Sequence, residues 1–219
     1  MAKFKVGICS LLCEKDIDIE KEVLKEDLFQ IIMMPYGSQN AFKDGIFDDV
    51  LEQIHGLIMA NTYVDAVVAP KLKNCKVVAR HGQGLDSLDL KACADHGIAV
   101  CNMPAFGVDE VSDHAVAFML LLMKSIHTYS LDVRRGFWNV EKVLAKNIRK
   151  INTSTLSLLG FGRIGQETAR KARALFGRIL AYDPFMNAEK ANELGVEPVY
   201  DLNVLFSEAD VLSIHIPLI

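Results

Sequence analysis

Three glycines and two neighbouring residues have the types and spacing that could bind a phosphorylated ligand. Gly160, Gly162 and Gly165 form G-x-G-x-x-G in the stretch "LLGFGRIGQ", between a run of strand character and a run of helical spacing. In such a turn the first glycine permits the tight bend, the second lets a pyrophosphate approach the backbone, and the third lets helix and strand pack closely. The helix start, at Arg163 and Ile164, would supply N–H donors and a partial positive charge to the phosphates.

An acidic residue follows this turn at a useful spacing. Asp183 lies 18 positions after Gly165 (183 − 165) and ends the second apolar run. At about this spacing an acidic side chain meets the ribose hydroxyls of a dinucleotide, and its charge would repel a 2′-phosphate, which favours NAD over NADP. A glycine turn can also be an ordinary strand-to-helix corner without a ligand. Because strand, turn, helix, second strand and acid occur in order, the sequence favours dinucleotide binding.

A second glycine turn, "RHGQGLD", begins at Arg80. The adjacent amides of Gln83 and Gly84 could form an anion-binding concavity. The alternative is that Gly82 and Gly84 only shape a strand-to-helix turn, and the residues alone favour that alternative.

Composition limits the classes of partner. The chain has 219 residues, 51% of them hydrophobic, with a net charge of −4 and a pI near 5.9. Nucleic acid and acidic membrane surfaces are therefore poor partners, and a small anion needs a local binding device. The longest apolar run, residues 115–123, is about half of what a bilayer crossing needs. Five cysteines without C-x-x-C spacing indicate a reducing, cytoplasmic setting without disulfides or zinc.

Apolar runs alternate with amphipathic stretches, which predicts an α/β fold with parallel sheets. Asp89 is placed to cap a short helix and Gly97 to end it, before a strand over residues 98–102. Helical spacing predicts one long helix over residues 109–130, then a polar linker, then a fresh unit near Ser154. We expect a domain of residues 1–103 and a second of residues 104–219.

Four blocks together resemble the D-isomer-specific 2-hydroxyacid dehydrogenases. They are "VVARHGQGLDSLDLKACADHGIAVCNMP", "DEVSDHAVAFMLLL", "LLGFGRIGQETARKARALFGRILAYDP" and "ADVLSIHIPL", and the likeness runs from about residue 50 to the end. The first two blocks are most similar to the branch that contains the carboxy-terminal-binding-protein corepressors. The resemblance implies a flavodoxin-like substrate domain and a partial Rossmann NAD-binding domain.

The resemblance also implies site residues. The amides of Gln83 and Gly84, with Arg80, would hold the carboxylate of a small 2-keto or 2-hydroxy acid, and His215 and Pro217 would form part of the cofactor wall. His215 is a poor candidate for an acid–base residue. In the family, a catalytic arginine, glutamate and histidine follow the segment that matches "HIPL", and none follows Pro217 here. We therefore expect a truncated dehydrogenase, without catalytic residues and without turnover.

Two other functional classes stay open at this point. The chain could be a non-catalytic, NAD(H)-sensing scaffold of the corepressor kind, or a non-functional remnant of an interrupted gene. The family usually dimerises through the nucleotide domain and its long helices, so the apolar helix around residues 115–123 makes a homodimer possible.

Overall fold

The computed structural model describes residues 3–9, 17–35, 38–138 and 148–217. The chain divides into two compact units, Met1–Phe106 and Gly107–Ile219. Each unit is described by itself. Half of the expected linker after residue 136, residues 139–147, lies outside the described residues. The assignment of residues 1–103 to substrate and of 104–219 to cofactor stays a prediction.

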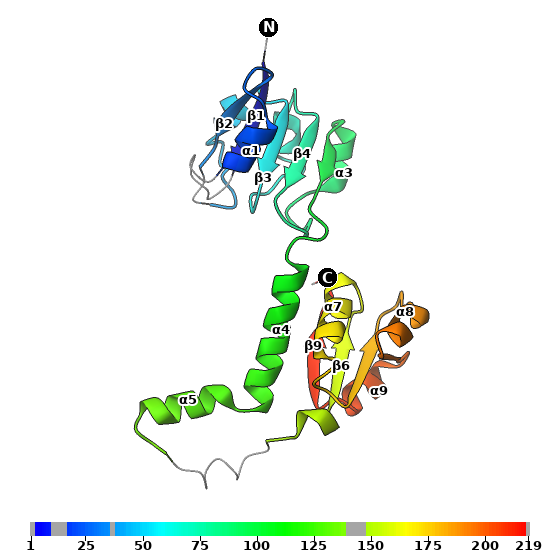
Figure 1. The fold of residues 1–219 in the computed structure, drawn as a ribbon. Coiled ribbons are helices and arrows are strands. Elements are labelled where there is room, and N and C mark those ends of the chain that lie inside the picture. The colour runs from blue at the N-terminus through cyan, green and yellow to red at the C-terminus, as the bar shows by residue number, and fades with distance from the viewer. Residues whose placement is uncertain (1–2, 10–16, 36–37, 139–147, 218–219) are drawn as a thin grey trace. The chain divides into compact units, whose positions relative to one another are not determined.

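The first unit is built on a five-stranded parallel sheet in the order β2-β1-β3-β4-β5 (Figure 1). This is the strand order of flavodoxin-like folds, so the predicted fold class is confirmed. The elements are β1 (Phe4–Cys9), α1 (Asp18–Val23), β2 (Phe29–Met33), α2 (Asp48–Leu51), β3 (Gly56–Met59), η2 (Ala69–Lys71), β4 (Val77–Arg80), α3 (Leu90–Asp95) and β5 (Ala99–Cys101).

The core of this unit joins one face of the sheet to the segments that cross over it. Leu57, Met59 and Val78 from the strands are at most 1% exposed and pack in one cluster with Phe42 and Leu51. Burying side chains of this size stabilises a fold by roughly 1.5–3 kcal/mol each. The core thereby fixes where β4 ends and where the turn "RHGQGLD" begins.

The predicted limits of α3 are confirmed. The Asp89 carboxylate accepts a hydrogen bond of 2.9 Å from the Ala92 N–H, as an N-cap does. Gly97 has φ +69°, the left-handed conformation that ends a helix. The strand after it, β5, is shorter than the predicted residues 98–102.

The second unit has a four-stranded parallel sheet in the order β8-β7-β6-β9 (Figure 1). It matches the 3-2-1-4 portion of the Rossmann strand order, which confirms the partial Rossmann prediction. The elements are α4 (Val108–Met123), α5 (Ile126–Arg134), η3 (Ile151–Thr153), β6 (Thr155–Leu159), α7 (Arg163–Ala172), β7 (Arg178–Tyr182), α8 (Ala188–Glu193), β8 (Glu197–Pro198), α9 (Leu202–Ser207) and β9 (Val211–Ile214).

Both faces of this sheet are covered, which explains why its strands read as apolar runs. Leu156 and Leu158 of β6 pack in a cluster with Met119 of α4 and Ala169 of α7. Leu180 of β7 points to the other face and packs in a separate cluster with residues that include Leu205 of α9. The two clusters hold β6, and hence the turn after it, from both sides.

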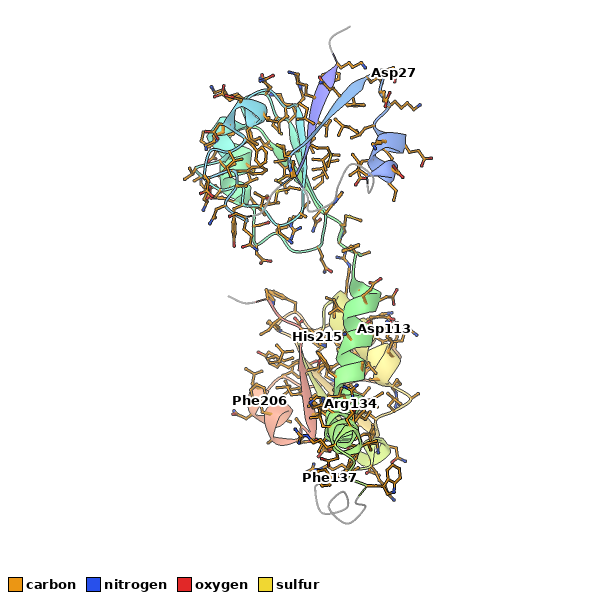
Figure 2. All side chains as sticks on the ribbon, turned by 90° about the vertical axis from the view of Figure 1, so that its left-hand side faces the viewer. Asp27, Asp113, Arg134, Phe137, Phe206 and His215 are labelled. Carbon is orange, nitrogen blue, oxygen red and sulfur yellow. The ribbon has the colours of Figure 1, made fainter. Side chains whose placement is uncertain are left out.

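A lysine fixes the start of α4 on α7. The Lys171 ammonium lies 2.7 Å from Asp113 Oδ1, 3.0 Å from Asp109 Oδ1 and 2.8 Å from Ser112 Oγ. Burial lowers the pKa of Lys171, but the hydrogen bonds that its ammonium donates to Asp113 and Asp109 more than offset this effect, so that its pKa is raised. Asp113 is labelled on α4 in Figure 2.

The prediction of one helix over residues 109–130 is wrong. The segment forms two helices, α4 and α5, which are bent by 65° at a break between them. Ser125 has φ +52°, a left-handed conformation that interrupts the helical path. Figure 2 labels Arg134 at the end of α5 and Phe137 beyond it. Within the described residues, no single helix is long and apolar enough to cross a membrane, although this bent pair passes by length and composition alone.

Candidate functional site

The glycine turn lies between the end of β6 and the start of α7, as predicted. The first intrahelical bond runs from the Gln166 N–H to the Gly162 carbonyl, at 2.9 Å. Among the residues that the structure describes, no side chain caps the helix at Gly162. The N–H groups of the first turn of a helix have no intrahelical acceptors, and they carry the positive end of the helix dipole. The turn therefore offers an anion a set of backbone donors.

The three glycines differ in what a side chain would meet. A Cβ at Gly160, where φ is +98°, would lie 2.6 Å from the His215 carbonyl oxygen, and a Cβ at Gly165 would overlap the Gly160 carbonyl. At Gly162 a Cβ would meet none of the described atoms within 4 Å, and the backbone has an ordinary φ of −71°. The fold itself requires Gly160 and Gly165. The space beside Gly162 is open, so a ligand can approach the backbone there.

Asp183 is held at this turn by both carboxylate oxygens. Its Oδ2 accepts a hydrogen bond of 2.7 Å from the Phe161 N–H, and its Oδ1 accepts one of 2.8 Å from the Phe185 N–H. The parallel register pairs Leu159 with Tyr182, which brings the two strand ends side by side. A carboxylate has about four acceptor positions, so two remain for the hydroxyls of a ribose. The side chain thus lies at the turn as the dinucleotide hypothesis requires.

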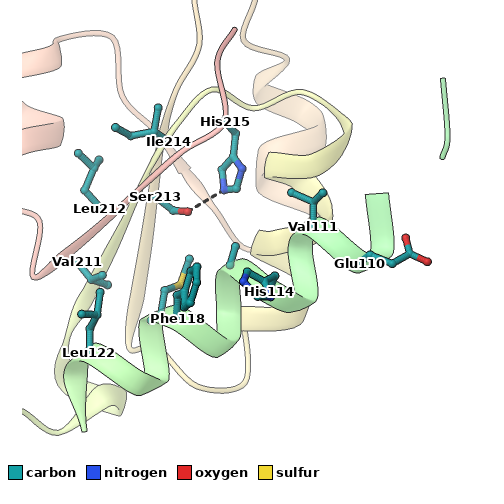
Figure 3. A pocket seen from close by; sticks show the side chains of 12 residues that line it. Glu110, Val111, His114, Phe118, Leu122, Val211, Leu212, Ser213, Ile214 and His215 are labelled. Atoms are coloured by element: carbon teal, nitrogen blue, oxygen red, sulfur yellow. Dashed lines mark hydrogen bonds between the residues drawn. The ribbon is translucent and has the colours of Figure 1, made fainter. Parts of the chain in front are cut away.

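The end of β9 lies against the same turn. The His215 N–H donates to the Leu159 carbonyl at 2.7 Å, and Pro217 follows, exposed, two residues later. The His215 ring, however, is directed toward a groove of about 570 Å³ between α4 and β9, where its Nε2 lies 3.0 Å from Ser213 Oγ (Figure 3). Burial lowers the pKa of His215, which favours the neutral ring. Its role as a cofactor wall stays a prediction, carried by the backbone more than by the ring.

The second glycine turn in the first unit has unused donors. The carbonyls of Gly82 and Gln83 accept bonds from the Met103 N–H (3.0 Å) and the Asn102 side chain (2.7 Å). Within the described residues, the N–H groups of Gln83 and Gly84 donate to no protein acceptor. The anchored carbonyls leave these two amides available to a ligand.

Arg80 adds a cation to this turn. Its Nη1 donates to the His81 carbonyl at 2.8 Å, and its Nη2 lies 3.4 Å from Asn61 Oδ1. Its Nε is buried and has no partner among the described residues. A buried donor without an acceptor is costly, so a bound anion would relieve it. The structure thus brings Arg80, Gln83 and Gly84 together in one turn.

The sequence did not single out two residues that shape these turns. The Gln166 side chain donates to the Phe161 carbonyl at 2.9 Å, and Asn102 anchors Gln83. The position of Gln166 directly after Gly165 was a weak signal, since an amide there can reach the preceding turn. Nothing in the sequence marked Asn102, because its bond depends on the pairing of β4 with β5.

Comparison with known sequences gives a family match within the second unit. Residues 116–219 match the model described as D-isomer specific 2-hydroxyacid dehydrogenase, NAD binding domain. This match agrees with the resemblance predicted from the sequence. The family model covers the whole glycine turn, Asp183 and the end of β9, and the cofactor it names is NAD, as the sequence predicted.

Two similar enzymes are longer than this chain. D-3-phosphoglycerate dehydrogenase of Archaeoglobus fulgidus is 35% identical over 161 residues, which are 74% of this chain and 30% of that protein. Hydroxypyruvate reductase of Thermotoga maritima is 35% identical over 181 residues, 83% of this chain and 57% of that protein. The chain thus spans about a third to somewhat over half of these relatives' length. They are enzymes, and they give no support to the corepressor-like alternative.

A solved structure agrees with the fold over the whole chain. The apo form of D-mandelate dehydrogenase from Rhodotorula graminis superimposes with a TM-score of 0.84 at 23% identity, covering 100% of this chain and 67% of that one. At this identity the likeness concerns the fold alone. It confirms the α/β class with parallel sheets.

Proposed function

We propose that this chain binds NAD(H) and a small 2-keto or 2-hydroxy acid, as the binding part of an NAD-dependent oxidoreductase that transfers a hydride between them. The observation that carries the proposal is Gly162. It is a glycine that neither the backbone conformation nor the packing of the fold requires, at the start of α7 and beside an anchored Asp183. When bound, NAD(H) would supply or accept the hydride.

The cofactor part of the proposal rests on complementary groups. The pyrophosphate would lie at the start of α7, against the N–H groups of Gly162, Ile164 and Gly165 and beside Arg163. Asp183 would accept hydrogen bonds from the adenosine ribose and repel a 2′-phosphate, which selects NAD over NADP. His215 and Pro217, beside the turn, would form the wall next to the cofactor.

The substrate part rests on the turn after β4. The amides of Gln83 and Gly84 would hold the substrate carboxylate, and the guanidinium of Arg80 would place a positive charge beside it. The relatives named above act on D-3-phosphoglycerate or hydroxypyruvate, so a small 2-hydroxy or 2-keto acid is the class of substrate that fits.

Binding of the coenzyme is the first test, because it uses residues that the chain contains. We expect titration with NADH to change the fluorescence of the protein or of the coenzyme. The dissociation constant should lie in the micromolar range, which corresponds to a binding free energy of about −8 kcal/mol. NADPH should bind much more weakly. Wild-type chain that registers neither heat nor fluorescence change with excess NADH would refute the cofactor proposal.

A separate test concerns the carboxylate. Oxamate, an unreactive analogue of a 2-keto acid, should bind the NADH-loaded chain, and Arg80→Met should weaken it about 10- to 100-fold, since hydrogen bonds to charged groups contribute about 1.5–3 kcal/mol. Lys91→Met is the matched control, because Lys91 is an exposed cation of the same unit that pairs with Asp95. Equal effects of the two variants would contradict a role for Arg80.

We also propose that the chain forms a homodimer in a cytoplasmic setting. Phe118 and Leu122 of α4 are 53% and 67% exposed, and the four cysteines that the structure describes are unpaired. Sedimentation equilibrium should give a dimer for wild type and a monomer for Leu122→Lys; a wild-type monomer would contradict the proposal. That nucleic acid and membranes are not partners stays a prediction.

A further inference from the structure

The backbone of Phe161, inside the glycine turn, is held from both sides by side chains. Its N–H donates to Asp183 Oδ2 at 2.7 Å, and its carbonyl accepts from Gln166 Nε2 at 2.9 Å. Phe161 is only 4% exposed, and both bonds are partly shielded from water. Each bond is of normal length and fixes one of the two peptide groups that Phe161 shares with its neighbours.

The bond from Gln166 also sets the direction of the next N–H group. The carbonyl of Phe161 and the N–H of Gly162 belong to one planar, trans peptide group, in which they point in opposite directions. A side chain that holds the carbonyl therefore orients the Gly162 N–H to the other side. Gly162 has no side chain and no side-chain cap, so Gln166 is the described group that fixes this peptide.

We propose that Gln166 is a positioning residue of the pyrophosphate site, which acts together with Asp183 through the backbone of Phe161. The inference rests on the proposed binding of NAD(H). The two side chains hold the turn in its binding geometry before the cofactor arrives, so that binding does not have to order the turn. Asp183 thereby has a second task, separate from any contact with a ribose.

The alternative is that Gln166 only stabilises the local fold. The positioning role and this structural role differ in the ligands whose binding a substitution of Gln166 would affect. Gln166→Met keeps the length and shape of the side chain and removes the donor. The positioning role predicts that this variant binds NADH and ADP-ribose, which carry the pyrophosphate, about 5- to 10-fold more weakly, as expected for one partly buried hydrogen bond. Adenosine, which has no phosphate, should bind with unchanged affinity.

Gln53→Met is the matched control. The Gln53 side chain also donates to a backbone carbonyl, that of Asp49, at 2.8 Å, but in the first unit. It should leave the affinities for all three ligands unchanged. Equal weakening of adenosine and ADP-ribose by Gln166→Met, or unchanged affinity for ADP-ribose, would overturn the positioning role.

Hydrogen exchange of the cofactor-free chain tests the geometry without any ligand. The Phe161 amide should be protected in wild type, and its exchange should rise about fivefold in Gln166→Met, with a shift of the Gly162 amide resonance. Unprotected Phe161 in wild type would refute the inference even if NADH binds. Protected Phe161 in a chain that binds no NADH would instead refute the proposed function and leave the backbone geometry in place.

Discussion

Replacing each of the three glycines of the turn by alanine should separate folding from ligand binding. At Gly160 the new Cβ would lie 2.6 Å from the His215 carbonyl oxygen and 2.9 Å from Ile216 Cγ2, with φ at +98°. Left-handed strain of about 1–2 kcal/mol adds to overpacking of about 1–3 kcal/mol, so the unfolding free energy should fall by roughly 2–5 kcal/mol. Gly165→Ala overlaps a backbone carbonyl and should cost about 1–3 kcal/mol.

Gly162→Ala should behave in the opposite way. The Cβ would meet none of the described atoms within 4 Å, so the unfolding free energy should change by less than about 0.5 kcal/mol. A small loss at the N-cap is offset by a less flexible unfolded chain. The same Cβ would occupy the space through which the pyrophosphate approaches. A clash of about 1.4–2.8 kcal/mol weakens NADH binding about 10- to 100-fold.

Urea unfolding followed by circular dichroism gives the stabilities, and calorimetric titration with NADH gives the affinities. Gly160→Ala is the internal control for a variant that loses binding because it loses its fold. If Gly162→Ala is as unstable as Gly160→Ala, the geometry of the turn is misassigned. If it is stable and binds NADH as wild type does, Gly162 does not face the ligand and the central argument fails.

Three further perturbations have defined outcomes. Burial lowers the pKa of His215 below its ordinary 6.5, so the unfolded chain takes up this proton first. As the pH falls below about 6.5, wild type should therefore lose more unfolding free energy than His215→Gln in parallel urea titrations. Arg178 forms an exposed bidentate pair with Glu197, so Arg178→Gln should cost about 0.5–1 kcal/mol in low salt and less in 0.5 M NaCl, measured by urea unfolding. Asp183→Ser should reduce the preference for NADH over NADPH, measured by calorimetry. It should also weaken the binding of NADH about tenfold, because the Phe161 N–H loses its acceptor.

The fold could be predicted largely from the sequence because its central strands, β1, β3, β6 and β7, are mostly buried on both faces. Such strands appear as apolar runs, and the alternation of runs and amphipathic stretches leaves few arrangements other than parallel sheets. The break at Ser125 could not be predicted, since no glycine or proline marks it and the helical spacing continues through it. There the tertiary structure overrides the local pattern.

The position of the glycine turn, between a strand and a helix and beside Asp183, could be predicted from the sequence, but its anchoring could not. The spacing predicts that Asp183 meets a ribose, whereas its bond to the Phe161 N–H arises from the register that pairs Leu159 with Tyr182. Likewise, the sequence shows Gln166 only as one of several polar residues of a helix. Its bond to the Phe161 carbonyl becomes visible only in the folded structure. Such bonds depend on which strand ends lie side by side, and a single sequence does not state that.

Both candidate sites offer backbone N–H groups to an anionic ligand. A chain with a net charge of −4 offers anions no general attraction, yet both proposed ligands are anionic. In each turn, side chains take up the backbone carbonyls or fix the peptide groups, Asn102 at Gln83 and Gln166 at Phe161, which leaves the neighbouring N–H groups for the ligand. Neutral backbone donors held in this way reduce the number of cations that an anion site needs, and Arg80 adds one beside the second turn. Asn102→Ala should accordingly weaken the binding of oxamate and leave the binding of NADH unchanged. Gln166→Met should weaken the binding of NADH and leave the binding of oxamate unchanged. A variant that weakened the binding of both ligands equally would show that the two turns do not act independently.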